Sequence, residues 1–215
     1  SLYLKTLYSG ENNMELSLLI GIAAFAFVTS VTPGPNNMML LASGAQFGFT
    51  RTLPHMIGIV IGVAMLLFCV LLGLGALFTL YPSLYSVLNV AGSAYLLWLA
   101  WKIASGPVAA ISEDDDTDSQ PLRWWQAALF QFVNPKAGMM ALGGGSTFSL
   151  PGDEYVLSGA MIMLAFAAIG FPAISVWAGA GAKLRDWLNS PKRRRGFNLT
   201  MGAATAATLL LIVDF

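Results

Sequence analysis

The chain has 215 residues, of which 56% are hydrophobic and only 10% are charged. Soluble globular domains carry about a quarter charged residues, so this composition excludes a soluble protein and predicts one that resides in a lipid bilayer. Eleven basic and eleven acidic residues give a formal net charge of zero, which excludes a nucleic-acid partner because phosphate recognition needs a basic face.

The first half of the chain contains three apolar runs, each long enough for a membrane-spanning helix of about 20 residues. Residues 1–13 precede Met14, and we interpret them as a remnant added for expression, outside the fold. The first span covers residues 16–47 and is interrupted by Thr32-Pro33-Gly34-Pro35-Asn36-Asn37. The second span covers residues 54–80 and the third covers residues 83–104. We therefore expect residues 14–104 to form a unit of three transmembrane helices.

The second half begins after a polar stretch, residues 105–123, whose acidic run is typical of a solvated loop. The fourth span begins near Trp124, is broken at Asn134-Pro135-Lys136 and continues to Phe148. The fifth span covers residues 155–182 and the sixth covers residues 197–213. Residues 124–215 are thus expected to form a second unit of three helices. The predicted fold is an all-α membrane protein with six transmembrane helices.

Basic residues in the loops predict the orientation, because cytoplasmic loops carry an excess of Lys and Arg. Nine basic residues lie in the loops after spans one, three and five, and none lies in the loops after spans two and four. They are Arg51, Lys102, Arg123, Lys183, Arg185, Lys192, Arg193, Arg194 and Arg195. We therefore expect a multi-pass protein with both termini on the outer, periplasmic side and the acidic loop in the cytoplasm.

An internal repeat relates the two halves. A shift of 101 residues aligns residues 38–47 with residues 139–148, and five of the ten positions are identical. The same shift brings the break at Pro33-Gly34-Pro35 onto the break at Asn134-Pro135-Lys136, so span one corresponds to span four. Because the halves are displaced by three spans, an odd number, they cross the membrane in opposite directions. The sequence thus predicts a 3+3 inverted-topology repeat.

The two breaks indicate where a substrate binds. Unwound backbone at membrane depth persists only where protein or a water-lined cavity satisfies its polar groups, and proline removes a donor. Breaks at equivalent points of two repeats favour a binding site at the midplane, although simple kinks remain the alternative for Pro33 and Pro35. An ammonium near the bilayer centre is costly, so Lys136 is expected to face a cavity. Its alternative is to extend to an interface.

Three motifs carry a resemblance to a known family: TPGPNN at residues 32–37, AYLLWLAWK at residues 94–102 and FVNPKA at residues 132–137. With these motifs, residues 14–215 resemble the lysine exporter and threonine/homoserine exporter family (LysE/RhtB), amino-acid efflux proteins of the bacterial inner membrane. The resemblance implies export from the cytoplasm in exchange for protons. The chain looks like the branch that exports cysteine, O-acetylserine and other neutral amino acids. No acid lies at membrane depth to balance a basic substrate, which argues against lysine or arginine.

The resemblance and the residues together predict the site. An amino acid is a zwitterion, so we expect Lys136, with freed N–H groups near Asn134 and Pro135, to bind its carboxylate. The ammonium is expected to bind at the first break, with the residues Pro33, Gly34, Pro35, Asn36 and Asn37. Proton coupling is assigned to Lys136 or to His55, the only histidine, for which an anchor at headgroup level is the alternative. No cofactor or metal is expected, since Cys69 is the only cysteine.

Other classes of function remain open. A channel or facilitator, or a non-transporting scaffold, would contain the same spans without saturable efflux. An intramembrane enzyme would need Ser146 as nucleophile with His55 as its base, and the sequence offers no orienting acid. The glycine pairs Gly58/Gly62 and Gly179/Gly181 permit close helix contact within one chain or between two. Because the apolar spans lie in a bilayer, membrane lipid is an expected partner. The glycine pairs leave a homodimer open.

Overall fold

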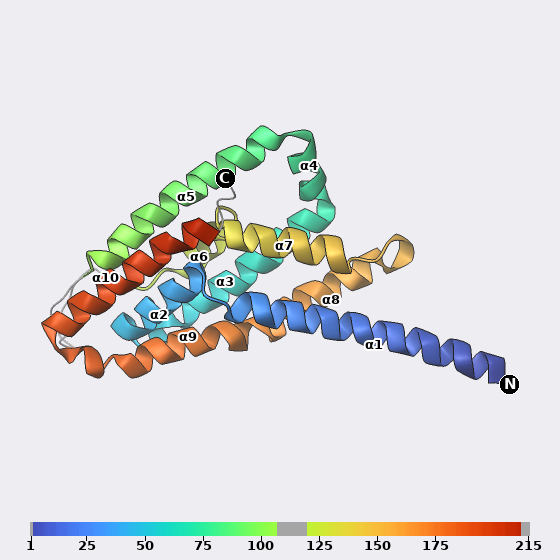
Figure 1. Ribbon diagram of the computed structural model, residues 1–215, viewed down its shortest axis with the longest axis horizontal. Coiled ribbons are helices and arrows are strands. Elements are labelled where there is room, and N and C mark those ends of the chain that lie inside the picture. The colour runs from blue at the N-terminus through green and yellow to red at the C-terminus, as the bar shows by residue number, and fades with distance from the viewer. Residues whose placement is uncertain (1, 107–119, 212–215) are drawn as a thin grey trace.

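The computed structural model describes residues 2–106 and 120–211, and these residues are arranged almost entirely in helices (Figure 1). The acidic run at residues 113–118 lies outside the described residues. The α-helices are α1 (Leu2–Val31), α2 (Pro35–Phe47), α3 (Phe49–Cys69), α4 (Gly75–Leu80), α5 (Pro82–Ala104), α6 (Trp124–Phe130), α7 (Pro135–Phe148), α8 (Tyr155–Ala168), α9 (Gly170–Leu184) and α10 (Pro191–Ala207). Short helical turns join them: η1 (Val70–Leu74), η2 (Gly152–Glu154), η3 (Trp187–Asn189) and η4 (Thr208–Leu211).

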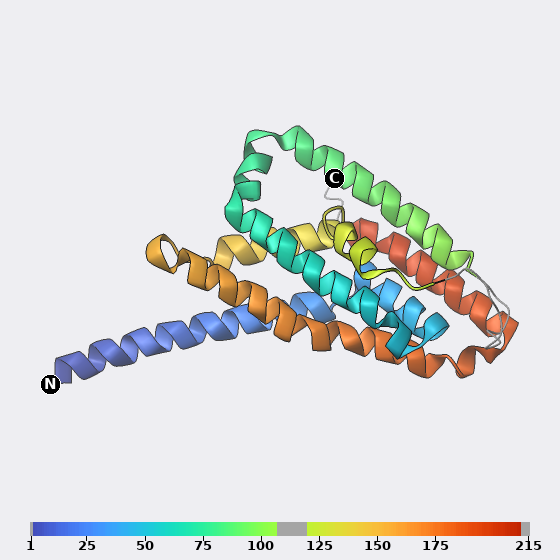
Figure 2. The same ribbon diagram turned by 180° about the vertical axis from the view of Figure 1, so that it is seen from behind.

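The first predicted span is broken where the sequence indicates. Helix α1 ends at Val31 and α2 begins at Pro35, with a bend of 56° between them. Proline is favoured in the first turn of a helix, where its missing N–H costs no hydrogen bond, and it prevents α1 from continuing. Residues 2–13 continue α1 away from the rest of the bundle (Figures 1 and 2), and their interpretation as an addition stays a prediction.

The turn between the first two spans is shorter than predicted. Gly48 adopts a positive φ of 82°, which is accessible mainly to glycine, and it reverses the chain between α2 and α3. Helix α3 therefore begins at Phe49, not near Pro54, which lies inside the helix. At its far end, Gly73 has a φ of 110° inside η1 and redirects the chain into α4.

The second half repeats the interrupted pattern. Helices α6 and α7 are separated by turns at residues 131–134, with Pro135 in the first turn of α7. Helices α8 and α9 follow each other closely, so that residues 152–184 form a continuous apolar helical stretch. Helix α10 begins at Pro191 and includes the basic residues that precede the predicted sixth span.

The arrangement of six spans is confirmed only in part. Within the described residues, three helical stretches are long and apolar enough to cross a membrane: Phe49–Leu77, Ser86–Ala104 and Gly152–Leu184. The bent pair α1 and α2 makes a fourth if it is counted as one span. Helices α6 and α7 are short because of the break between them, and α10 has 17 residues. The 3+3 inverted repeat stays a prediction.

Close helix contacts within the chain are made at glycines. A Cβ on Gly44 of α2 would lie 2.1 Å from the carbonyl oxygen of Ala178 in α9, and one on Gly181 would lie 2.1 Å from that of Leu41. Gly58 of α3 approaches the backbone of Trp124 equally closely, at 2.1 Å. Gly181 and Gly58 therefore make their close helix contacts within one chain. This intrachain use leaves the homodimer without support from these two residues.

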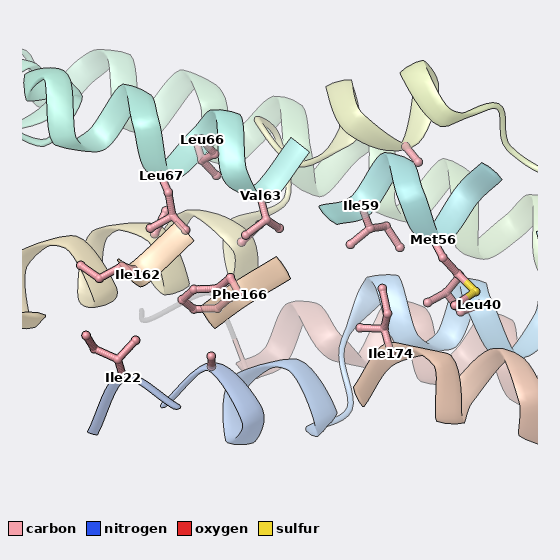
Figure 3. Close-up of a cluster of buried hydrophobic side chains, with 14 of the residues drawn as sticks. Ile22, Leu40, Met56, Ile59, Val63, Leu66, Leu67, Ile162, Phe166 and Ile174 are labelled. Carbon is pink, nitrogen blue, oxygen red and sulfur yellow. The ribbon is translucent and has the colours of Figure 1, made fainter. Parts of the chain in front are cut away.

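A hydrophobic core lies between the two halves of the chain. Buried side chains from α1, α2, α3, α8 and α9 meet in one cluster (Figure 3). Phe166 of α8 and Ile174 of α9 face Val63 and Ile59 of α3 across this cluster (Figure 3). Burying an aliphatic side chain of this kind contributes about 1.5–3 kcal/mol. The core thereby fixes the position of α3 and α9 beside the two breaks.

Candidate functional site

The break between α1 and α2 leaves backbone carbonyls without helical partners, and side chains supply the missing donors. The Asn37 Nδ2 group donates to the carbonyl oxygens of Ser30, at 2.8 Å, and Thr32, at 2.7 Å. The indole Nε1 of Trp177 in α9 donates to the carbonyl oxygen of Val31, at 3.1 Å. A free carbonyl in a bilayer costs several kcal/mol, so these two donors allow the break to exist.

Lys136, in the second half of the chain, donates further hydrogen bonds to the first break. Its Nζ donates to the carbonyl oxygen of Thr32 at 2.7 Å, to the Thr32 hydroxyl at 3.0 Å and to the carbonyl oxygen of Pro33 at 3.3 Å. The ammonium thus rests on three oxygens of the other break. Lys136 is half-buried, and its Nζ points to the first break.

Gly34 makes this approach possible. Its backbone is extended, with φ −178° and ψ 176°, so its conformation does not itself require glycine. A Cβ at this position, however, would lie 2.6 Å from Cδ and 2.9 Å from Nζ of Lys136. Glycine leaves room for Lys136 in this position, because the lysine side chain lies directly against the backbone.

The backbone polar groups at the break between α6 and α7 find their hydrogen-bond partners in a different way. Tight turns satisfy its own backbone, with the N–H of Asn134 donating to the carbonyl oxygen of Gln131 at 3.3 Å. Asn134 then caps α7, because its side-chain oxygen accepts from the N–H of Lys136 at 3.2 Å. Gly92 of α5 packs against this break, and a Cβ there would lie 1.9 Å from the carbonyl oxygen of Val133.

A cluster of side-chain amides joins the two breaks. Asn36 and Gln131 exchange two hydrogen bonds, at 2.8 and 3.1 Å. Gln131 also donates to the carbonyl oxygen of Ala127 at 2.9 Å and accepts from Asn134 at 3.3 Å. Its side chain is fully buried. Every polar atom of Gln131 is therefore committed to structure, and Asn36 is held by the same pair.

The predicted site residues do not include Gln131 or Trp177, although the sequence places both deep enough in their spans to line a pathway. The signal for Gln131 is its position within an apolar span, three residues before Asn134. Trp177 also lies deep in its span, where contact with lipid or packing is the alternative role. Only the packing of α9 against α1 brings its indole to the carbonyl of Val31.

A cavity of about 40 Å³ lies between the two breaks. Such a volume holds a few water molecules. Its polar lining residues are Thr29, Ser30, Asn36, Asn37, Asn134 and Lys136, and Gly34 also lines it. Its apolar side is formed by the core of Figure 3, including Ile59, Val63, Phe166 and Ile174.

The predicted site residues therefore gather in one region, with different roles. Gly34, Asn36, Asn37, Asn134 and Lys136 line the cavity. Pro35 and Pro135 are buried in the first turns of their helices, and Pro33 contributes its carbonyl to Lys136.

His55 lies outside this cavity. It is 2% exposed, and neither ring nitrogen has a hydrogen-bond partner among the residues that the structure describes. This burial argues against an anchor at headgroup level. The ring borders a second cavity of about 840 Å³, which Lys102 and Arg123 also line. The Ser146 hydroxyl donates within its own helix to Gly143, so the pairing of Ser146 with His55 in an enzyme is contradicted.

Comparison with known proteins gives a consistent result. Residues 27–211 match the family model described as LysE type translocator. The chain is similar to proteins named cysteine/O-acetylserine efflux protein from Escherichia coli O1:K1, E. coli strain K12 and Shigella sonnei strain Ss046. In each comparison it is 33% identical over 171 residues, which are 78% of this chain and 84% of the relative. No solved structure matches the chain.

Proposed function

The chain belongs to the LysE family of translocators, and on that premise we propose that it exports neutral amino acids or their derivatives by alternating access. Family membership indicates a transporter of the bacterial inner membrane and not an enzyme. The relatives named for efflux of cysteine and O-acetylserine support small neutral substrates.

The observation that carries the proposal is the contact between Lys136 and the first break. An ammonium donor from one half of the chain meets three oxygen acceptors from the other, at 2.7 to 3.3 Å. A zwitterion bound between them would offer its carboxylate to Lys136 and its ammonium to the carbonyls of Thr32 and Pro33. The two kinds of group that an amino acid needs are therefore present side by side.

The asparagines take supporting roles in this proposal. The nitrogen of Asn37 already holds the carbonyls of Ser30 and Thr32, and the amide of Asn36 is paired with Gln131. Asn37 thus positions the acceptors, and Asn36 and Asn134 connect the two breaks through Gln131. Pro35 and Pro135 start the helices that follow the breaks, and Gly34 admits the lysine side chain.

The charge of the cavity favours neutral amino acids. Lys136 is the only ionisable residue among its described lining residues. A neutral amino acid brings a carboxylate that balances this ammonium, whereas a basic substrate would add an uncompensated positive charge at membrane depth. This supports substrates such as cysteine over lysine or arginine.

The two cavities support a carrier over an open pore. The cavity at the breaks has room for only a few waters and is separate from the larger one of about 840 Å³. The larger cavity is lined by Lys102 and Arg123, which belong to loops predicted to be cytoplasmic. We infer that it is the cytoplasmic entrance, and that transport requires the inverted repeats to rearrange around the breaks.

The test of this function is an efflux panel in proteoliposomes, with neutral and basic amino acids, repeated without a proton gradient. Neutral amino acids should leave by a saturable process that weakens when the gradient is collapsed. Lys136→Gln should lower transport efficiency about 10- to 100-fold, the loss expected for one charged hydrogen bond. Lys183→Gln is the control, because Lys183 is exposed at the end of α9. Linear flux, or a Lys136→Gln variant with unchanged apparent affinity, would contradict the proposal.

Proton coupling is proposed at Lys136 or His55, and the two are separable. His55→Gln removes a titratable ring that has no partner in the described structure and leaves the contacts of Lys136 in place. If His55 carries the proton, this variant should transport at the same rate with and without a proton gradient. If its gradient dependence is retained, the assignment falls to Lys136.

A further inference from the structure

The ammonium of Lys136 occupies the position that the proposed function gives to the ammonium of the substrate. Its Nζ lies 2.7 Å from the carbonyl oxygen of Thr32 and 3.3 Å from that of Pro33, with the Thr32 hydroxyl at 3.0 Å. These are the acceptors assigned to the substrate. The protein's own primary ammonium and that of an amino acid therefore compete for one set of oxygens.

We propose that Lys136 is a tethered ammonium that fills this subsite, and that only a ligand bringing its own carboxylate displaces it. The inference rests on the proposed function and adds a rule of specificity. Primary amines that lack a carboxylate are rejected, although they fit the carbonyls as well as an amino acid does.

The first argument is one of space. The cavity between the breaks measures about 40 Å³, and an amino acid is larger than the few waters that this volume admits. The side chain of Lys136 lies along Gly34, where even a Cβ would come within 2.6 Å of it. A substrate ammonium can bind all three oxygens only when Lys136 leaves them, because its Nζ already lies against each one.

The second argument concerns the oxygens that Lys136 leaves. The carbonyl of Thr32 keeps a hydrogen bond from Asn37, but within the described residues the carbonyl of Pro33 is bonded only to Lys136. The vacated subsite therefore needs a new donor, and a substrate ammonium supplies it. Thr32 and Pro33 are exposed, so a small cation can reach their oxygens.

The third argument concerns the displaced lysine. No described lining residue of the cavity is acidic, so a released Lys136 finds no anionic partner among them. The carboxylate of an amino acid provides one. An amine without a carboxylate would instead place its ammonium beside that of Lys136, where repulsion between like charges opposes binding.

The tethered ammonium can be tested by removing it and adding it back. Lys136→Ala deletes the atoms from Cγ to Nζ, which correspond to n-propylammonium. We expect propylammonium to raise the apparent melting temperature of the purified variant by about 3 °C at roughly ten times its Kd, and to do so saturably. Propan-1-ol and tetramethylammonium should give no such rise, because one lacks the charge and the other lacks N–H donors.

Two controls make this test specific. Wild-type protein should not respond to propylammonium, because its subsite is filled, and Lys183→Ala should behave like wild type. An equal response in wild-type protein and in Lys136→Ala would overturn the proposal, as would the absence of any response in a folded Lys136→Ala.

Specificity can also be read from the wild-type protein, which removes any dependence on the folding of the alanine variant. Cysteamine is cysteine without its carboxylate. In wild-type proteoliposomes it should inhibit cysteine efflux at least about 100-fold more weakly than unlabelled cysteine does, which at about tenfold per 1.4 kcal/mol corresponds to losing one ion pair. In Lys136→Gln this gap should narrow about tenfold or more. Equal inhibition by cysteine and cysteamine in wild type would overturn the proposal.

The two proposals fail in distinguishable ways. If no amino acid is exported, the proposed function fails, but the melting experiment still reports whether an ammonium subsite exists. If cysteine is exported and propylammonium has no effect on Lys136→Ala, the proposed function stands and the tethered ammonium is wrong.

Discussion

The two breaks in this chain precede similar sequences and each lies directly before a helix that begins with proline, but they are stabilised in opposite ways. The break between α1 and α2 exposes acceptors, and its carbonyls depend on donors from Asn37, Trp177 and Lys136. The break between α6 and α7 closes its own backbone in tight turns and contributes the lysine. The first break therefore supplies hydrogen-bond acceptors, and the second break supplies a donor, Lys136.

This difference assigns different tasks to the two breaks. A break whose acceptors are held by side chains can exchange one donor for another, as a binding site must. A break that closes its own backbone and is packed against Gly92 is better suited to hold Lys136 in a fixed place. Substitutions that disturb the packing of the second break should therefore mainly affect stability, whereas a substitution that displaces Lys136 from the first break should mainly affect specificity.

The largest expected effect is that of Gly92→Ala at the second break. The new Cβ would lie 1.9 Å from the carbonyl oxygen of Val133, so α5 and the turn must separate, at a cost of about 3 kcal/mol. Thermal unfolding in detergent measures it. Gly138→Ala is the control, since a Cβ at Gly138 of α7 meets nothing within 4 Å and should not destabilise. Equal stability of the two variants would show that the second break is not tightly packed.

Gln131→Leu should have the next largest effect, because it removes the amide that joins the breaks. Asn36 loses both of its hydrogen bonds to Gln131, and Asn134 loses one. We expect a loss of about 2 kcal/mol in unfolding free energy. Gln126→Leu, which removes a cap at the start of α6, should cost about half as much. A neutral Gln131→Leu would mean that the amide cluster does not couple the two breaks.

A smaller loss is expected for Trp177→Phe, which removes the donor to the carbonyl of Val31. The cost should be about 1 kcal/mol, the net value of one hydrogen bond. Trp101→Phe is the matched control because Trp101 is exposed on α5, and its melting temperature should equal that of wild type. If the two variants have the same melting temperature, the stability of the first break does not depend on the hydrogen bond from α9.

Gly34→Ala should change stability least and specificity most. The extended backbone of Gly34 accepts alanine, and the atoms that a Cβ meets belong to the flexible end of Lys136. We expect a stability change below about 0.5 kcal/mol and a displaced Lys136, so that cysteamine inhibits cysteine efflux several-fold better than in wild type. Strong destabilisation, or unchanged discrimination between cysteine and cysteamine, would contradict the idea that the acceptors of the first break can exchange one donor for another.

The sequence was sufficient to locate the breaks, but not to describe how each is satisfied. Proline at residues 35 and 135 determines where α2 and α7 begin, and this local rule is readable without a structure. The start of α3 at Phe49 was missed, because a single glycine with positive φ replaced the expected loop. Pro54 looked like a helix boundary and is instead tolerated inside α3.

By itself, the sequence determined that the chain is a helical membrane protein and that Lys136 needs a polar partner, because apolar composition and the cost of a buried charge are local properties. Only the tertiary structure decided which partner it has. The carbonyls of Thr32 and Pro33 lie about a hundred residues away along the chain, and their separation from Lys136 in space depends on how α7, α9 and α1 pack. Backbone oxygens are present at every residue, so no pattern of side chains marks the ones that packing brings together.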